Sequence, residues 1–193
     1  LPIKSQIEIH NFFDFNKGKE FVQFYSNELI LSNRKWISLY HFLQKFQKVS
    51  RFRIINLFFK NLEKLSLLFQ EYVLKVNRLD KGFNFQKGAT WFSITDEFAH
   101  HIIKNKEWVL KTFKFSQSSD EIFIQTLLVN SDFIKNLYHK EFDNKNIAIM
   151  RYIDWNRGFP YVFKSCDFED LISSPYLFAR KFNSSHDKKI IDR

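Results

Sequence analysis

Cysteine is nearly absent from this sequence, with Cys166 the only one in 193 residues. A single cysteine excludes an internal disulfide framework and any zinc site built from several cysteines. No Cys-His-Asp pattern surrounds Cys166, so we expect it to be a small buried residue. Sparing use of cysteine is typical of a reducing compartment, and we therefore expect a cytoplasmic location.

Glycine, proline and long apolar runs are also scarce. The chain has 4 glycines and 3 prolines against 25 phenylalanines, and 45% of its residues are hydrophobic. This share is typical of a globular protein rather than a disordered one, so we interpret most phenylalanines as core residues. No apolar run reaches the roughly 18 residues that cross a bilayer. The nearest run, 54–69, is interrupted by Lys60, Glu63 and Lys64.

Negative charge is in deficit, with 21 acidic residues against 30 lysines and arginines and a formal net charge of +9. Such an excess suits a phosphate-bearing partner, an anionic membrane surface or a nucleic acid. The basic residues are dispersed and form no block of five or six like charges, so we expect no nucleic-acid partner. A phosphate-bearing substrate and peripheral contact with the inner face of a cell membrane both stay open.

The hydrophobic pattern predicts alternating helices and strands, which is typical of the α/β class. Ser5 and Glu8 have the spacing of a capping box and predict a helix over 5–15. Apolar residues that recur every three or four positions predict a long amphipathic helix over 50–75. The other predicted elements are strands over 19–25, 89–94, 148–153 and 177–182, a helix over 167–172, and helices that begin near 95 and 118.

Four segments, in order along the chain, carry a resemblance to a known family. They are Leu1-Pro2-Ile3-Lys4-Ser5 with Ile7-Glu8, Lys87-Gly88-Ala89-Thr90-Trp91-Phe92-Ser93, the run 118–128 that begins Ser118-Ser119-Asp120-Glu121 and continues at Asn130-Ser131, and a C-terminal run of 151–158, 167–171 and 177–182. Together they resemble the inverting glycosyltransferases of the core-2/I-branching and peptide O-xylosyltransferase family, as a bacterial-type member. The string Leu-Phe-Ala-Arg-Lys-Phe over 177–182 is the most diagnostic, and 34–81 is the least alike.

The resemblance implies a GT-A-type α/β domain with a mixed sheet flanked by helices. The family's first nucleotide-binding βαβ region should precede Leu1. We therefore expect 1–193 to be the C-terminal portion of a single catalytic domain. Open α/β sheets bind ligands at the carboxyl ends of their strands, and we expect the site there by analogy.

Glu121 is the catalytic base that the resemblance implies. An inverting transferase makes one displacement at the anomeric carbon, so it needs a base for the acceptor hydroxyl, and a positioned carboxylate can supply it. The local spacing supports a second interpretation, in which Glu121 forms a capping box with Ser118. Spacing alone favours the cap, and the resemblance favours the base.

The resemblance also implies that cations, and no metal ion, neutralise the departing UDP. Arg180 and Lys181 stand where the family places these cations, and both side chains suit phosphate. The chain has no Asp-x-Asp motif, and the nearest candidate, Asp167-Phe168-Glu169, heads a predicted helix as a cap. None of its six histidines forms a pair four residues apart on one helix, so we expect neither a metal nor a cofactor.

Trp155 and Trp91 are candidate acceptor-binding residues, because an indole ring packs well against the apolar face of a sugar. Either could instead be a core residue. Arg157 is a further candidate for contact with the acceptor or a phosphate.

The function that follows is transfer of a sugar from a UDP-sugar to a hydroxyl of a glycan acceptor. We expect N-acetylglucosamine as the sugar, with xylose from UDP-xylose as the alternative. A non-catalytic carbohydrate-binding relative is a third interpretation, which the intact Glu121, Arg180 and Lys181 disfavour.

Overall fold

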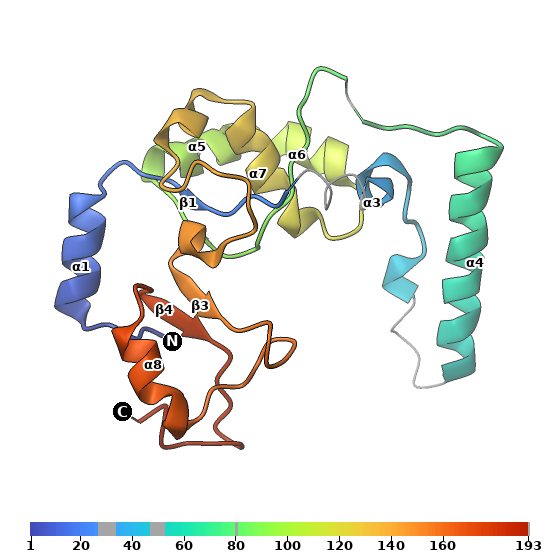
Figure 1. Cartoon of the computed structure of the whole chain (residues 1–193). Helices are drawn as coiled ribbons and strands as arrows, with labels where there is room; N and C mark the ends of the chain where they lie inside the picture. Colours follow the sequence, from blue (N-terminus) through green and yellow to red (C-terminus); the bar gives the residue numbers. More distant parts are fainter. Residues whose placement is uncertain (27–33, 47–52, 80, 193) are drawn as a thin grey trace. The chain divides into compact units, whose positions relative to one another are not determined.

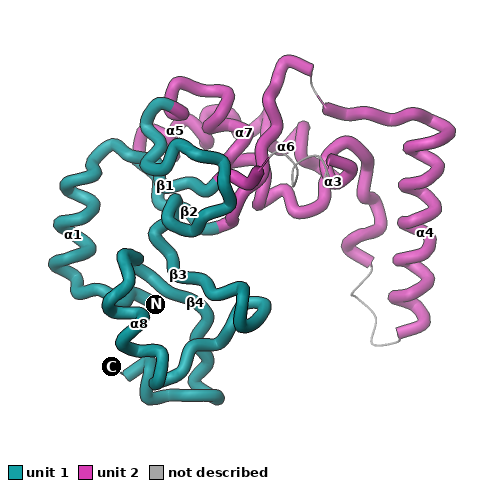
Figure 2. The backbone as a smooth tube through the Cα atoms, viewed as in Figure 1, with its two compact units in different colours: residues 1–23, 91–95, 135–193 teal, residues 24–90, 96–134 magenta. Residues whose placement is uncertain are grey.

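The computed structural model of the chain describes residues 1–26, 34–46, 53–79 and 81–192. The chain divides into two compact units, coloured separately in Figure 2, and each is described by itself. Unit 1 comprises 1–23, 91–95 and 135–193, and unit 2 comprises 24–90 and 96–134. Helices and short strands occur together, in agreement with the predicted α/β class.

Unit 1 contains two short two-stranded sheets and two helices (Figure 1). Its elements are α1 (Gln6–Phe15), β1 (Phe21–Val22), β2 (Phe92–Ser93), β3 (Arg151–Ile153), α8 (Phe168–Ser173) and β4 (Phe178–Arg180). Strand β1 pairs antiparallel with β2, and β3 pairs parallel with β4, with Ile153 opposite Arg180.

Helix α1 begins as the sequence predicts. The Ser5 hydroxyl accepts a hydrogen bond from the Glu8 N–H at 3.3 Å, and the Glu8 carboxylate accepts one from the Ser5 N–H at 2.8 Å. This reciprocal pair satisfies two of the N–H groups that a helix start leaves without partners. The capping box is therefore confirmed.

The core of unit 1 consists of two apolar clusters. One cluster contains Phe163, Leu171, Ala179 and Ile190. The other contains Phe21, Met150 and Leu177, and the ring of Phe21 stacks on that of Tyr138 at 4.5 Å between centroids. Strands β3 and β4 are each anchored by residues of these clusters, because Met150 precedes β3 and Ala179 lies within β4.

Two sequence predictions for unit 1 need correction. The strand predicted over 148–153 begins only at Arg151, because Asn146–Ile149 form a 3₁₀ turn that ends at Met150 with φ of +51°. A left-handed residue cannot continue an extended strand. Ala148, Ile149 and Met150 are nevertheless buried, which is why their apolar run resembles a strand in the sequence. Cys166 is exposed rather than buried.

Unit 2 is mainly helical. Its helices are α3 (Lys35–Ser38), α4 (Arg53–Tyr72), α5 (Asp96–Lys104), α6 (Lys106–Phe113) and α7 (Phe123–Val129). Its core cluster contains Ile37, Phe113 and Ile122, with Phe85 and Trp108 packed against it.

The helices predicted near 95 and over 50–75 are present in unit 2, and 50–52 of the latter lie outside the described residues. Helix α5 begins with two acidic residues, Asp96 and Glu97, which interact favourably with the positive end of the helix dipole. Among the described helices, none is both long enough and apolar enough to cross a membrane.

Candidate active site

The segment that leads to Lys87 is held against α7 by side chains of that helix. Asn130 donates from its side chain to the carbonyl of Asn84 at 2.8 Å and accepts from the N–H of Asn84 at 3.0 Å. The fully buried Gln125 donates to the carbonyl of Ala89 at 2.9 Å. These amide groups replace the partners that a sheet would give to an extended backbone, and they hold residues 84–89 along α7, with Asn84 near its end and Ala89 near its start.

Glu121 lies at the start of α7, in the 3₁₀ turn Ser119–Glu121 that precedes the helix. Its carbonyl accepts a hydrogen bond from the Gly88 N–H at 2.9 Å. Its carboxylate lies 3.1 Å from the ammonium group of Lys87, with 10% of the lysine side chain and 34% of the glutamate side chain exposed. The cation is thus inside the protein, and the carboxylate that it holds reaches solvent.

Two aromatic residues enclose the Lys87 ammonium. It lies 3.9 Å from the ring centroid of Trp36 and 5.8 Å from that of Tyr25, distances at which a cation is attracted to an aromatic face. The Tyr25 N–H donates to the Lys87 carbonyl at 2.8 Å. Burial, together with the negative charge of Glu121, raises the pKa of the Tyr25 phenol. The phenol therefore stays protonated near neutral pH.

The interpretation of Glu121 as a helix cap is wrong. Ser118 has a left-handed backbone with φ of +47°, and its side chain makes no capping hydrogen bond. A capping box requires the serine hydroxyl to accept a hydrogen bond from a backbone N–H of the helix, and Ser118 makes no such bond. The ion pair with Lys87 is the contact that orients the carboxylate, and its exposed part is open to a proton donor.

In unit 1, two arginines lie over one indole ring. The guanidinium carbons of Arg180 and Arg151 lie 5.0 and 5.3 Å from the centroid of the Trp91 ring. The position of Arg180 is set by the parallel pairing of β4 with β3. Trp91 directly precedes β2, and Thr95, just after β2, donates two hydrogen bonds to the buried carboxylate of Glu20.

These two arginines form a concentration of positive charge. Within the described part of the chain, neither Arg151 nor Arg180 has an acidic ion-pair partner. Burial lowers the pKa of Arg151, yet a guanidinium stays charged at neutral pH. Lys181 is the next residue after Arg180 and is exposed. An anion placed among these side chains would supply the counter-charge that the described residues do not.

Trp155 and Arg157 lie together on another loop of unit 1. Residues 152–157 line a pocket of about 400 Å³, and 51% of Trp155 is exposed. The Arg157 guanidinium is bound by Asp154 and by Asp167 at 2.7 Å, and these hydrogen bonds raise its pKa. Both carboxylates neutralise Arg157 and hold it against the loop that carries Trp155. A contact of Arg157 with the acceptor or a phosphate stays a prediction.

Asp167 directly precedes α8, but its side chain makes no capping hydrogen bond to that helix, so the predicted cap is wrong. Its carboxylate accepts a hydrogen bond from the Lys164 N–H at 2.8 Å as well as from Arg157. Among the described residues, His139, Glu141 and Asp143 form a group whose ligand atoms lie within 4.8 Å of one another. The Lys145 ammonium already lies 2.7 Å from Asp143, so a lysine supplies positive charge there. The metal-free reaction stays a prediction.

The predicted site residues thus fall into two groups. Glu121 belongs to unit 2, and the others belong to unit 1: Arg180, Lys181, Trp91, Trp155 and Arg157. Sequence reasoning missed Lys87 and Arg151, although both stand in the segments that carry the family resemblance. The pairing of Lys87 with Glu121 spans 34 positions, and no local spacing rule predicts such a contact.

Comparison with known protein families shows which family the chain matches. The family model of the Core-2/I-Branching enzyme matches residues 1–171 of the chain. No curated protein matches it. The matched range includes Lys87 and Glu121 but ends before 177–182, so the family placement of Arg180 and Lys181 rests on the sequence resemblance alone. The chain belongs to the Core-2/I-branching family of GT-A-like glycosyltransferases.

Proposed function

We propose that this glycosyltransferase is inverting and metal-independent, and that it transfers N-acetylglucosamine from a UDP-sugar to a hydroxyl of a glycan acceptor. The observation that carries the proposal is the Glu121 carboxylate, which Lys87 holds at 3.1 Å and which remains one-third exposed. A carboxylate that is fixed in position, serves no helix cap and reaches solvent is suited to remove a proton from an acceptor.

The reaction is a single displacement. The acceptor hydroxyl gives its proton to the Glu121 carboxylate while its oxygen forms a bond to the anomeric carbon. The bond from that carbon to the UDP oxygen breaks on the opposite face, so the configuration inverts and the electron pair leaves with UDP. Lys87 lies beside the base, and its ammonium keeps the carboxylate in one orientation.

The departing diphosphate is the anion that suits the arginine cluster of unit 1. The family resemblance assigns diphosphate binding to Arg180 and Lys181. We add Arg151 because its guanidinium lies over the same Trp91 ring as that of Arg180. Cations that stabilise the charge developing on the leaving group lower the barrier directly. They would perform the role that a divalent metal performs in other transferases.

Trp155 is the residue best placed to contact an acceptor sugar. Half of it is exposed, and it lines the pocket over 152–157. An indole face buries the apolar C–H groups of a sugar ring. Trp91, by contrast, is engaged with two guanidinium groups, which favours a role in supporting the cations over direct contact with the acceptor.

The donor sugar has one alternative. Ser119-Asp120-Glu121 resembles the N-acetylglucosaminyl branch of the family, whereas 155–157 and 177–182 resemble the xylosyl branch. Xylose from UDP-xylose is therefore the second candidate. We propose a cytoplasmic enzyme, on the basis of its single cysteine, that acts on a cell-surface glycan precursor.

The test is UDP release by the full chain from a panel of UDP-sugars with glycan acceptors, in the presence of EDTA. We expect turnover with UDP-N-acetylglucosamine that EDTA leaves unchanged and that Glu121→Gln lowers by about 10²–10⁴-fold. Asp120→Asn, at the adjacent position, is the matched control and should keep most activity. Full activity of Glu121→Gln would refute the base, and glycan binding without turnover would indicate a non-catalytic relative.

A further inference from the structure

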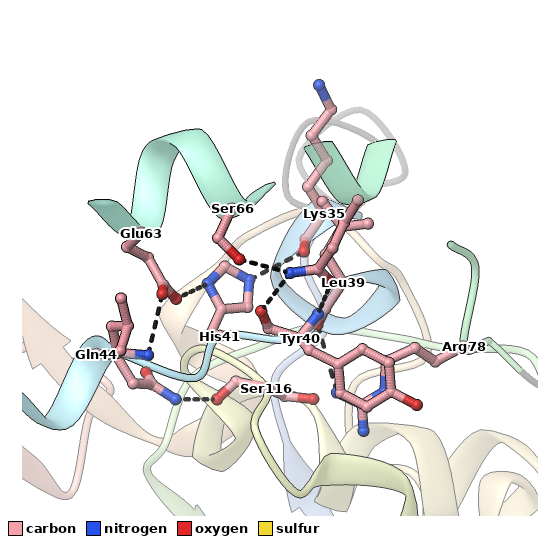
Figure 3. Close-up of polar contacts among 11 residues, drawn as sticks. Lys35, Leu39, Tyr40, His41, Gln44, Glu63, Ser66, Arg78 and Ser116 are labelled. Carbon is pink, nitrogen blue, oxygen red and sulfur yellow. Dashed lines mark hydrogen bonds and ion pairs between the residues drawn. The ribbon is translucent and has the colours of Figure 1, made fainter. Parts of the chain in front are cut away.

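Helix α4 packs against the rest of unit 2 through its polar face. Gln70 is 5% exposed and exchanges two hydrogen bonds with the backbone of Tyr40, at 2.8 and 2.9 Å. Glu63 is 4% exposed, accepts from the Leu43 N–H at 3.0 Å and lies 3.6 Å from the ring of His41. Figure 3 shows the Glu63 side chain directed from α4 toward His41 and Gln44.

The opposite side of α4 is apolar and exposed. Residues spaced three, four or seven apart lie on one face of a helix. Six such residues form the outer face of α4, each at least half exposed: Ile54, Leu57, Phe58, Leu65, Phe69 and Tyr72. Ordinary amphipathic helices turn such a face to the core, so an apolar patch of this length facing outward marks an interaction surface.

A basic stripe borders this apolar face. Arg53, Lys60 and Lys64 follow one another along one flank of the helix, and all are exposed. Glu71 lies on the same flank, but its carboxylate is paired with Lys35 at 2.7 Å. The flank therefore carries net positive charge, which adds to the overall charge of +9.

We propose that the outer face of α4 binds an anionic membrane surface, with the helix lying in the plane of the lipid headgroups. An apolar face bordered by lysine and arginine is the pattern of helices that bind in this way, inserting apolar side chains among the acyl chains. The basic stripe selects anionic lipid, since each lysine or arginine near such a surface adds to the attraction. A second copy of the chain is a poorer occupant, because two basic flanks would meet and repel.

The inference is independent of the proposed reaction and is tested on the full chain with lipid vesicles. We expect co-sedimentation with phosphatidylcholine vesicles that contain phosphatidylglycerol, and little with phosphatidylcholine alone. Raising the salt to about 1 M, where the Debye length is about 3 Å, should weaken binding. Phe58→Gln/Leu65→Gln/Phe69→Gln should abolish it. Lys60→Gln/Lys64→Gln should weaken it about 30-fold, at about 1 kcal/mol for each lysine.

A control variant replaces exposed apolar residues elsewhere in unit 2. Ile103 and Leu110 are 68% and 56% exposed on α5 and α6, and Ile103→Gln/Leu110→Gln should bind like the wild-type chain. Far-UV circular dichroism checks that each variant keeps its helices. Equal binding to neutral vesicles, or equal loss in the control variant, would overturn the proposal. So would a vesicle-independent dimer that the triple substitution dissociates, because the occupant would then be a second copy.

Discussion

Replacing Lys87 with methionine removes the cation that orients Glu121 while keeping most of the side-chain volume. At 3.1 Å between the charged atoms, and with an effective dielectric constant of about 20, the gross attraction is about 5 kcal/mol. One-third of the Glu121 side chain is exposed, so water replaces most of that attraction when the lysine is lost. We expect a net loss of about 1–2 kcal/mol in the free energy of unfolding.

The effect on the reaction should be larger than the effect on stability. A carboxylate that is free to turn toward water spends less time aligned with the acceptor hydroxyl, and misplaced groups cost about 10²-fold in rate. We expect Lys87→Met to lower kcat by about that factor and to leave the KM for the UDP-sugar nearly unchanged. Lys87→Arg, which restores a cation, should recover part of the loss.

The assay is steady-state transfer by four chains: wild type, Lys87→Met, Glu121→Gln and the double variant. If Lys87 acts through Glu121, removing it from a chain that already lacks the carboxylate should change kcat little, so the two effects should not add. Additive losses, or an unchanged kcat in Lys87→Met, would refute the positioning role while leaving Glu121 as the base. Absence of transfer by the wild-type chain would instead refute the proposed function.

Three further predictions concern unit 1. Arg151→Ala should raise the KM for the UDP-sugar or lower kcat at least tenfold, as expected for a lost charge-assisted contact with phosphate, and a product-inhibition assay with UDP should show weaker binding; unchanged UDP affinity would exclude Arg151 from the site. Trp155→Ala should raise the KM for the acceptor and not that for the donor, measured by varying each separately. Burial alone would raise the pKa of Asp143, but hydrogen bonds from Lys145 and His139 depress it from 3.8 to about 2. The stabilisation that follows is present above about pH 4 and is lost as the pH falls toward 2, because the carboxyl group takes up its proton near pH 4 in the unfolded state and only near pH 2 in the folded state. Solvent screening reduces it to about 1 kcal/mol, and urea unfolding of Asp143→Asn should lack this acid-dependent part.

Local rules predicted the elements that local chemistry decides. The capping box of Ser5 and Glu8 and the acidic start of α5 need only neighbouring residues, and both are present. The periodicity of α4 predicted a helix with one apolar face, but periodicity cannot say which face packs. The polar face packs because Glu63 and Gln70 bind the backbone of Leu43 and Tyr40, which lie about 20 to 30 positions earlier in the chain.

The candidate site shows the same division. Glu121 could be identified from the family resemblance of the segment around it, yet the spacing alone favoured a cap. The left-handed backbone of Ser118 and its missing capping hydrogen bond exclude that cap. Lys87 and Arg151 could not be assigned roles, because their contacts are with residues distant in the sequence. Arg151 acquires its position from the parallel pairing of β3 with β4, and a pairing of three residues leaves little periodic signal.

The segment over 87–91 connects these findings. Lys87, in unit 2, holds the carboxylate that we propose to remove the proton, while Trp91, in unit 1, supports the arginines that we propose to receive the diphosphate. Within unit 2, Gln125 donates to the carbonyl of Ala89 and so holds the backbone next to Lys87. Two requirements of the proposed displacement therefore depend on five consecutive residues, which gives a physical reason for this segment to carry the family resemblance.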